Sequence, residues 1–352
     1  MPSPNEILAE LKKVKYPGFT RDIVSFGIIK DVEVASAGIT VVVAAPSAKP
    51  EVVTQIAEEV KRVIRAMPGV PAAVEVRLEQ PAPDAKARPQ QTMARRSIPG
   101  VAHIVAVASG KGGVGKSTVA VNLALAMRAL GWRVGLMDAD VYGPSIAMMV
   151  GAEKAVTLTP ERRIIPLERF GIRYVSMALF INDETAVIWR GPMVTKLETE
   201  FLFNVEWGEL DCLVLDLPPG TGDAQLTITQ RVELDGGVVV TTPQEIALVD
   251  VKRGVEMFRE VKVPVLGVVE NMSYYVCRKC GKRHEIFSHG GGARYAAELG
   301  VPFLGEIPIT RELREGGDTA SPIVAVNPGH AISGAFKEIA AKVIASIDTA
   351  RN

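Results

Sequence analysis

Apolar residues recur along this chain with two different periods, which predict where helices and strands lie. In the N-terminal part, helical spacing over 4–15 and 50–67 is interspersed with period-two alternation around 39–43 and 74–78. The second helical stretch opens on a proline and stops at a Met-Pro-Gly sequence. The pattern predicts the order helix, strand, strand, helix, strand, and therefore a small α/β domain over residues 1–80.

Both periods are lost over residues 81–100, where proline and alanine are frequent and large apolar residues are nearly absent. That composition is typical of an extended linker, so a second domain is predicted over 101–352. There, short apolar runs alternate with helical segments, which predicts an α/β fold with a mostly parallel, doubly wound sheet covered on both faces. The predicted strands lie at 103–109, 133–138, 212–218, 236–242 and 264–270, and the predicted helices at 116–130 and 246–259.

Composition narrows the class of protein further. The 352 residues include 40 basic and 40 acidic side chains, whereas proteins that bind nucleic acids usually carry a basic excess. No run of about 18 apolar residues and no signal-peptide pattern is present, so we expect a cytoplasmic protein with neither a nucleic-acid nor a membrane partner. Three cysteines are too few for a disulfide framework, which favours a reducing compartment.

An apolar face also runs along the C-terminal segment. A predicted helix there has few lysines on its polar side, unlike a helix that lies on a membrane surface. We therefore expect its apolar face to pack on the sheet of the second domain through Ile332, Phe336, Ile339, Val343 and Ile347.

The strongest chemical signal is a glycine-rich loop between the first strand and the first helix of the second domain. Its sequence matches G-x-x-x-x-G-K-[ST] in the strand, loop, helix context that the motif requires. Glycines let backbone N–H groups turn toward a polyphosphate, Lys116 adds positive charge near the β- and γ-phosphates, and the Ser117 hydroxyl can bind Mg²⁺. We predict a nucleoside triphosphate site formed by Gly110, Lys111, Gly112, Gly113, Val114, Gly115, Lys116, Ser117 and Thr118.

Two other strands of this domain end in carboxylates. Asp138 ends the strand over 133–138 and Asp140 follows it, and Asp216 lies near the end of the strand that begins at Cys212. Because the carboxyl ends of parallel strands lie at one edge of a sheet, we expect these acids beside the phosphate loop. Asp216 is predicted to be the Walker B carboxylate that supports Mg²⁺, and the Pro- and Gly-rich segment after it a nucleotide-dependent switch.

A pair of cysteines, Cys277 and Cys280, is spaced so that both sulfurs can face one metal. A zinc ion or an iron–sulfur cluster needs about four ligands, so two more must come from His284 and His289 or from the same pair in a second subunit. A redox disulfide is a third interpretation, although such pairs normally open a helix, whereas this one follows a late strand. The remaining thiol, Cys212, is predicted to be a core residue.

Several motifs of the second domain resemble those of one family. The form KGGVGKST is similar to the deviant phosphate loop of MinD, ParA, ArsA and the nitrogenase iron protein. Together with DADVYGPS, WRGPM at 189–193, the PPGTGD loop and the CxxC segment, it resembles the Mrp-like (ApbC-like) iron–sulfur cluster carrier ATPases over residues 101–345. The resemblance implies a homodimer in which a [4Fe–4S] cluster bridges the paired cysteines. The cluster then passes to apo iron–sulfur proteins, with slow ATP hydrolysis as the switch.

The resemblance also implies roles for single residues. Lys111 would reach the nucleotide of the facing subunit, Asp140 would hold the attacking water, and Asp138 would support the Mg²⁺ shell. Asn271 matches the asparagine that contacts adenine. These roles make ATP, Mg²⁺ and a [4Fe–4S] cluster the expected cofactors.

Two rival functions share this nucleotide chemistry. A MinD- or ParA-like positioning ATPase would bind a membrane or DNA instead of a cluster. An electron-donating ATPase would keep a bridged cluster and dock to a redox partner.

Residues 1–80 resemble the small domain of iron–sulfur assembly factors, with two departures. Where such domains commonly carry Asp-Pro-Glu and Cys-Pro, this chain has Tyr-Pro-Gly at 16–18 and Ala-Lys-Pro at 48–50. We therefore expect this domain to act in partner docking or regulation rather than through a cysteine.

Overall fold

The computed structural model describes residues 2–15, 22–24, 28–35, 38–43, 50–71, 73–78, 95–141, 143–151, 156–179, 201–220 and 222–350. The chain forms two compact units, Met1–Gln91 and Thr92–Asn352. Four features of the sequence fall outside the described residues: most of the linker (81–94), the WRGPM motif (189–193), and the divergent positions 16–18 and 48–49.

The N-terminal unit packs two helices against a three-stranded sheet. Helix α1 (Pro4–Leu11) begins at Ser3, which forms a reciprocal capping box with Glu6. The strand order is β1-β2-β3, in which β1 and β2 are antiparallel and β2 and β3 are parallel. The order of elements is the predicted one, with bounds β1 Ile29–Ala35, β2 Gly38–Val43, α2 Pro50–Arg65 and β3 Val74–Leu78.

The core of this unit follows from the two periods in its sequence. Every second residue of β2 is buried, and these side chains pack against the apolar faces of both helices. The core includes Ile7, Leu11, Ile39, Val41, Val43, Ile56, Val60 and Ile64.

The larger unit is built on an eight-stranded sheet in the order β15-β12-β11-β4-β10-β5-β9-β8. Neighbouring strands in it are parallel, apart from β8 with β9. The prediction of a mostly parallel α/β sheet is therefore confirmed. The strands are β4 Val101–Ala108, β5 Val134–Asp138, β8 Leu167–Arg169, β9 Ile172–Ser176, β10 Leu210–Asp216, β11 Gly236–Thr241, β12 Val265–Asn271 and β15 Phe303–Ile307.

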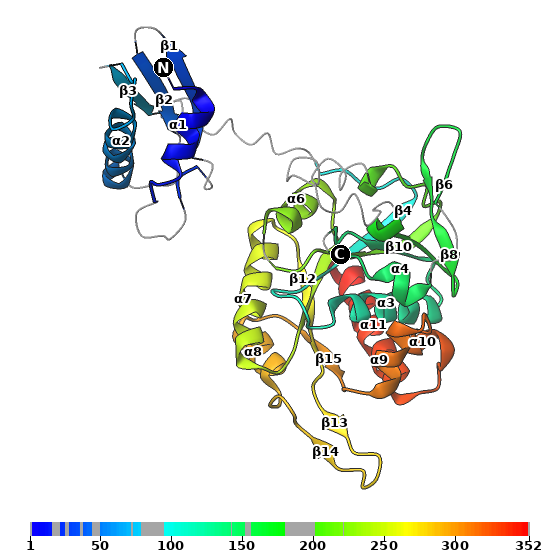
Figure 1. Ribbon diagram of the computed structural model, residues 1–352. Helices are drawn as coiled ribbons and strands as arrows, with labels where there is room; N and C mark the ends of the chain where they lie inside the picture. Colours follow the sequence, from blue (N-terminus) through cyan, green and yellow to red (C-terminus); the bar gives the residue numbers. More distant parts are fainter. Residues whose placement is uncertain are drawn as a thin grey trace. The chain divides into compact units, whose positions relative to one another are not determined.

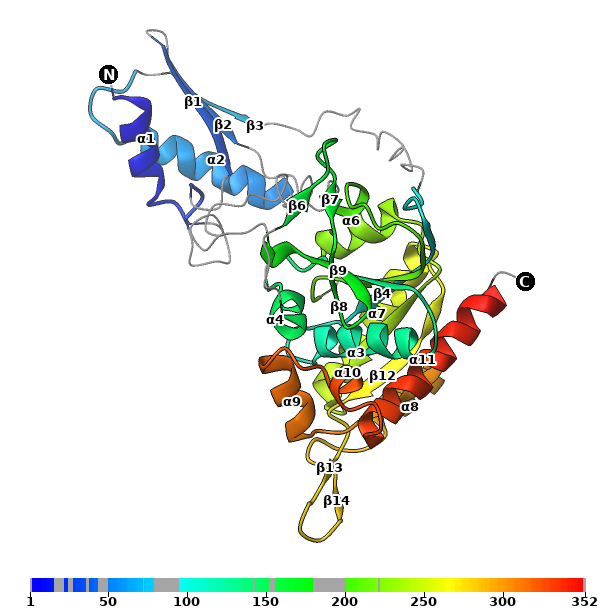
Figure 2. The same cartoon turned by 90° about the vertical axis from the view of Figure 1, so that its right-hand side faces the viewer.

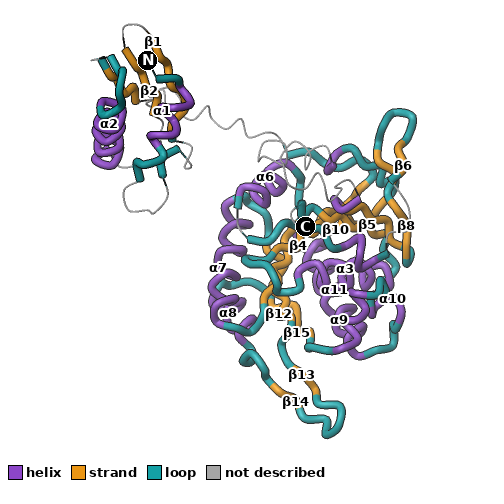
Figure 3. The backbone as a smooth tube through the Cα atoms, viewed as in Figure 1, coloured by secondary structure: helices purple, strands orange, loops and turns teal. Residues whose placement is uncertain are grey.

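Strand β4 lies inside the sheet, between β10 and β11. Its place beside β10 can be followed in Figures 1 and 3. From β4 the chain proceeds to β5 and β10 on one side and later to β11 on the other, so the strand order reverses at β4. Ligands of open α/β sheets bind beyond the carboxyl ends of the strands at such a switch point. The predicted phosphate loop therefore lies where this fold favours a binding site.

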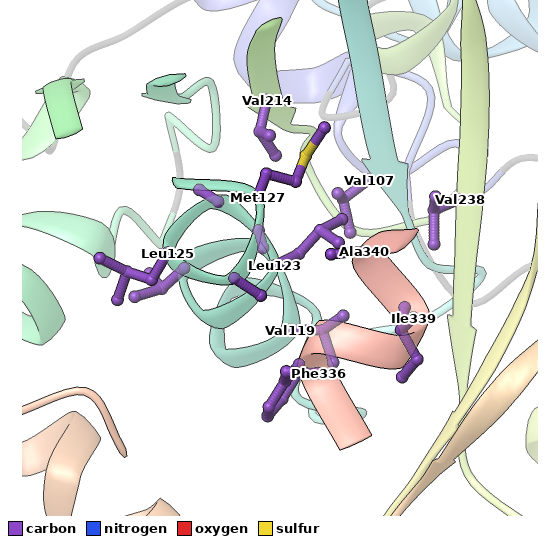
Figure 4. Close-up of a cluster of buried hydrophobic side chains, with 14 of the residues drawn as sticks. Val107, Val119, Leu123, Leu125, Met127, Val214, Val238, Phe336, Ile339 and Ala340 are labelled. Atoms are coloured by element: carbon purple, nitrogen blue, oxygen red, sulfur yellow. The ribbon is translucent and has the colours of Figure 1, made fainter. Parts of the chain in front are cut away.

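Helices cover both faces of the sheet. On one face α3 and α11 lie side by side, and Val119, Leu123 and Phe336 are among the buried residues there (Figure 4). Helices α6, α7 and α8 cover the other face, while α4, α9 and α10 lie on the α3 side. The helices are α3 Lys116–Ala129, α4 Ile146–Val150, α6 Asp223–Arg231, α7 Glu245–Glu260, α8 Gly291–Glu298, α9 Arg311–Asp318, α10 Ile323–Val326 and α11 Ala331–Ala350, with a short 3₁₀ turn, η1, at Met177–Leu179.

The apolar face of α11 packs on the core of this unit, as predicted. All five of its predicted contact residues are buried, namely Ile332, Phe336, Ile339, Val343 and Ile347. Cys212 is also a fully buried core residue, as predicted. None of the helices in the described part of the chain is long and apolar enough to cross a membrane.

Between β12 and α8 the chain leaves the sheet as an antiparallel hairpin. Strands β13 (Tyr275–Val276) and β14 (Arg283–His284) form its two arms, and it projects away from the body of the unit (Figures 1 and 2). A second short hairpin consists of β6 (Thr157–Leu158) and β7 (Ile164–Ile165). The predicted cysteine loop is the turn of the β13–β14 hairpin, which we call the cysteine hairpin (residues 275–284).

Candidate functional site

The glycine-rich loop joins the end of β4 to the start of α3. Gly113 and Gly115 have φ angles of 81° and 80°, where any other residue would be strained. Space is also limited, since a Cβ on Gly115 would lie 2.2 Å from Nδ2 of Asn271, and one on Gly110 would lie 2.3 Å from Cβ of Asp250. The loop leads directly into α3, whose first N–H groups have no partner within the helix. It can therefore present backbone N–H groups to an anion.

We expect Gly115→Ala to weaken nucleotide binding at least about tenfold, because left-handed strain and the clash with Asn271 each cost roughly 1–3 kcal/mol. Equilibrium binding of a fluorescent ATP analogue measures the effect. Gly329→Ala is the matched control, since a Cβ at Gly329 would meet nothing within 4 Å. Equal affinities of the two variants would contradict the steric argument.

Lys116, the first residue of α3, is buried and pairs with Asp216 at the end of β10. Its Nζ lies 2.5 Å from Oδ1 of Asp216 and 3.4 Å from Oγ of Ser117. Burial raises the pKa of the Asp216 carboxyl, and the ammonium of Lys116 opposes that rise. Oδ2 of Asp216 has no hydrogen-bond partner among the described residues. A lysine, a hydroxyl and an unpartnered carboxylate oxygen therefore converge at the first turn of α3.

Asp138 is fully buried at the end of β5, next to β10. Its carboxylate accepts hydrogen bonds from the Ser176 hydroxyl at 2.8 Å and from the N–H groups of Ser145 and Ile146 at 3.0 Å each. Burial raises the pKa of Asp138 to about 7, and the charge of Asp216 adds to the rise. Asp138 therefore holds the start of α4 against the strand ends.

Asp140 lies two residues further, in the segment that Asp138 supports. The N–H of Asp140 donates to Oδ1 of Asp138 at 3.2 Å, and Oδ1 of Asp140 accepts from the N–H of Gly143 at 3.1 Å. Asp140 is 6% exposed, whereas Asp138 is fully enclosed. Of the two carboxylates, Asp140 is the one that retains access to solvent.

A cavity of about 540 Å³ lies beside the glycine-rich loop. Gly115, Thr118 and Asn271 line it on the loop side, and Nδ2 of the buried Asn271 donates to the carbonyl of Val114 at 2.8 Å. A largely apolar cavity with a few placed polar groups suits a planar base. The apolar part of its wall comes from Met148, Met149, Met272, Phe287, Pro308, Ile309 and Leu313.

Sequence reasoning assigned no role to residues 308–318, which supply much of this wall. The segment directly follows β15, and α9 starts after Thr310, whose hydroxyl accepts from the N–H of Leu313 at 3.3 Å. One signal could have located it, because β15 is a parallel strand and its carboxyl end must share an edge with the phosphate loop.

Cys277 and Cys280 lie at the turn of the cysteine hairpin. The N–H of Cys277 donates to the carbonyl of Lys282 at 2.9 Å, and the N–H of Gly281 donates to the carbonyl of Cys277 at 2.8 Å. The backbone N–H groups of Cys280 and Lys279 donate to the Cys277 sulfur and lower the pKa of its thiol. This favours the thiolate, which is the form that binds metals.

Of the two histidines predicted as further ligands, the structure brings His284 to the cysteine pair. The ligand atoms of His284 and both cysteines all lie within 4.8 Å of one another. Nδ1 of His289 instead lies 2.8 Å from Nη2 of Arg283 and 3.6 Å from Oε1 of Glu285. His289 therefore contacts the base of the hairpin rather than its turn.

A buried carboxylate fastens both ends of the segment that contains the cysteine hairpin. Glu270, in β12, is fully buried. It accepts from the Ser273 hydroxyl at 2.6 Å, before the hairpin, and from the N–H of Gly292 at 2.5 Å, after it. The Glu270 side chain therefore connects the two ends of the segment that contains the cysteine hairpin.

The cysteine hairpin also contacts the wall of the cavity. The carbonyl of Tyr274 accepts from the N–H of Ile309 at 2.7 Å. Arg278, which lies between the two cysteines, forms an ion pair with Glu312 of α9. The segment that lines the cavity is therefore bonded to both the base and the turn of the hairpin.

A loop of this sequence at the switch point, with Lys116 facing Asp216, places the larger unit among the P-loop NTPases. The chain belongs to the NUBPL iron-transfer P-loop NTPase family, whose model (ParA) matches residues 100–344. A second family model, described as an iron–sulfur cluster assembly protein, matches residues 4–78.

Curated relatives extend this similarity over most of the chain. The "Iron-sulfur cluster carrier protein" of Aquifex aeolicus is 52% identical over 260 residues, which is 73% of this chain and 71% of the relative. The protein of the same description from Synechocystis is 40% identical over 355 residues and 99% of each chain. The "Iron-sulfur cluster transfer protein NUBPL" of Dictyostelium discoideum is 45% identical over 75% of this chain and 82% of its own.

Two solved structures resemble the larger unit. The nucleotide-binding protein of Archaeoglobus fulgidus in complex with ADP has a TM-score of 0.56 and 39% identity, covering 63% of this chain and 88% of its own. The cell division ATPase MinD of Pyrococcus furiosus has a TM-score of 0.54 and 19% identity, covering 69% of this chain and 99% of its own. The second likeness concerns the fold alone.

Proposed function

We propose that this chain is an iron–sulfur cluster carrier, in which the cysteine hairpin holds the cluster and the nucleotide site governs its transfer to apo iron–sulfur proteins. One observation carries the proposal. Strand β12 ends at Asn271, which lines the nucleotide cavity, and continues within a few residues into the hairpin that bears Cys277 and Cys280. Relatives described as iron–sulfur cluster carriers, at 40% and 52% identity, support it.

The cargo we propose is a [4Fe–4S] cluster shared by two copies of the chain. A cluster of this type takes about four thiolate ligands, one for each iron. Each hairpin offers two, Cys277 and Cys280, and the third thiol of the chain is buried in β10. A homodimer that brings two hairpins together supplies the full set.

The nucleotide we propose is ATP with Mg²⁺. Oxygen ligands suit this ion, and the site offers two: the Ser117 hydroxyl at the start of α3 and the unpartnered Oδ2 of Asp216 at the end of β10. Bound there, Mg²⁺ would neutralise charge on the β- and γ-phosphates. Lys116 leaves Asp216 to contact the same phosphates, the loop N–H groups bind them, and the base enters the cavity beside Asn271. Asp140 orients the attacking water.

Anaerobic reconstitution of the full-length chain with iron and sulfide tests this function. We expect about four iron atoms per two chains, and recovery of activity when the loaded protein is mixed with an apo iron–sulfur enzyme. Tightly bound zinc at one ion per chain, unchanged by reconstitution, would replace the carrier function with a structural metal site.

Asp140→Asn should bind ATP with nearly unchanged affinity and hydrolyse it at least about 100-fold more slowly, because the amide oxygen still accepts from Gly143 but no longer carries the charge that orients water. Phosphate release in a single turnover measures the loss. Asp348→Asn, on exposed α11 surface, is the control and should hydrolyse ATP normally. A normal rate for Asp140→Asn would remove this residue from the catalytic machinery.

Lys111→Ala should abolish the nucleotide-dependent homodimer that we propose, because the side chain would contact the phosphates of the partner's nucleotide. The loop itself should persist, since the Ser109 hydroxyl bonds the backbone carbonyl of Lys111 at 2.9 Å. Sedimentation with a non-hydrolysable ATP analogue measures the association, with Lys337→Ala as a surface control. Wild-type chain that stays monomeric with both analogue and cluster would rule out the role in trans.

We further propose that residues 1–80 form a docking or regulatory domain, joined by the linker over 81–100 to the ATPase domain over 101–352. The match to an iron–sulfur cluster assembly protein over 4–78 supports a function in the same process. All three cysteines lie in the ATPase domain, so any such role does not use a cysteine of residues 1–80. Exposed thiols that bind a cluster favour the reducing cytoplasm.

A further inference from the structure

Cys277, Cys280 and His284 form a group of potential metal ligands. The proposed bridged cluster uses the two cysteines but not His284. The ligand atoms of all three residues lie within 4.8 Å of one another. In a tetrahedral site with metal–sulfur bonds near 2.3 Å and metal–nitrogen bonds near 2.0 Å, ligand atoms are separated by roughly 3.5–3.8 Å. The ligand atoms therefore need to close by at most about 1 Å, which side-chain rotation can supply.

The backbone of the cysteine hairpin sets this spacing. Strand pairing places His284 opposite Tyr275, two residues before Cys277. The imidazole also lies beside the phenol ring, with ring centroids 6.4 Å apart. Gly281 closes the turn in the left-handed region at φ 68°, and it bonds the carbonyl of Cys277. The three ligands therefore arise from one short, internally bonded segment of a single chain.

Charge favours a divalent ion at this place. Two thiolates and a neutral imidazole balance a double positive charge. Two cations close by in the chain are themselves paired with carboxylates, Arg278 with Glu312 and Arg283 with Glu306. Nitrogen and sulfur ligands select zinc, ferrous iron or cobalt over magnesium and calcium.

We propose that each protomer holds one divalent transition-metal ion through Cys277, Cys280 and His284, with a fourth coordination position open at the exposed turn. The inference rests on the proposed function only in sharing the cysteine pair. Cluster bridging needs two chains, whereas this site takes all its protein ligands from one. The open position admits an external thiolate without prior loss of a protein ligand.

Cobalt(II) is the probe, added to the metal-free full-length chain without nucleotide or sulfide. We expect saturation at about one cobalt per chain, the visible bands of four-coordinate cobalt with a sulfur-to-cobalt charge-transfer band, and a monomer in sedimentation. His284→Ala should bind cobalt at least about tenfold more weakly and with altered visible bands. Losing a metal ligand should weaken binding at least as much as losing a group that hydrogen-bonds to a ligand, which typically costs about tenfold or more. His289→Ala is the matched control and should overlay the wild type.

Saturation at half an equivalent, with two chains per ion, would overturn the inference. A His284→Ala titration that overlays the wild type would do the same. Reconstitution with iron and sulfide separates the two ideas. If His284→Ala binds cobalt weakly but takes up as much cluster as the wild type, both the single-chain metal site and the carrier function are supported. If the wild-type chain binds cobalt as expected but takes up no cluster, only the carrier function is removed.

Discussion

Cys277→Ala and Cys280→Ala are each expected to remove the bound cluster almost completely while ATP hydrolysis continues. In the proposed homodimer each change halves the thiolate ligands from about four to two, which cannot hold a cubane cluster. Hydrolysis persists because the glycine-rich loop and Asp216 lie on other segments of the sheet. Iron per dimer after anaerobic reconstitution and the rate of phosphate release measure the two effects.

Cys212→Ala provides the matched control for both cysteine variants. It removes the same number of thiols from the chain, but Cys212 is fully buried in β10, and burial raises the pKa of its thiol. We expect wild-type iron content in this variant. Wild-type iron in Cys277→Ala, held as one cluster per chain, would defeat the bridging arrangement.

Lys116→Ala is expected to lower ATP turnover at least about 100-fold and to weaken nucleotide binding, because it removes the charge that the loop directs at the β- and γ-phosphates. The change also leaves Asp216 buried without its partner, which destabilises the larger unit by up to roughly 3–5 kcal/mol. Binding of a fluorescent ATP analogue and thermal unfolding measure the two losses.

A second variant separates the loss of chemistry from the loss of stability. Lys116→Ala combined with Asp216→Asn removes the uncompensated charge, so stability should return while turnover stays low. Lys252→Ala, on the exposed side of α7, should match the wild type in both measurements. Normal turnover in Lys116→Ala would contradict the site assignment.

Helices and strands that are determined by their own stretch of sequence could be predicted from it. Helix α3 was expected over 116–130 and spans Lys116–Ala129, and the strand expected over 264–270 is β12, Val265–Asn271. Both have long apolar runs. The glycine-rich loop precedes α3, and Pro264 precedes β12. The same local logic predicted a glycine-rich loop between a strand and a helix, which the structure has between β4 and α3, because that motif is continuous in the chain.

Contacts between distant residues could not be predicted in this way. Lys116 and Asp216 were each expected in the site, but their direct pairing joins positions 100 residues apart. Asp138 was expected to support the Mg²⁺ shell, and the sequence did not indicate that its carboxylate also accepts a hydrogen bond from the Ser176 hydroxyl, 38 residues away. The two-residue strands of the cysteine hairpin are too short for periodicity to distinguish from a loop.

The clamp at Glu270 has a consequence for how the cysteine hairpin can vary. Since Ser273 and Gly292 are both bonded to this one carboxylate, the ends of the intervening segment are held together whatever its length. Lengthening a loop whose ends are held together raises the entropic free-energy cost of closing it only logarithmically, by about 0.6 kcal/mol for each doubling of its length. The distance that the cysteines extend from the sheet can thus change by insertion or deletion while β12, α8 and the cavity beside the glycine-rich loop keep their positions.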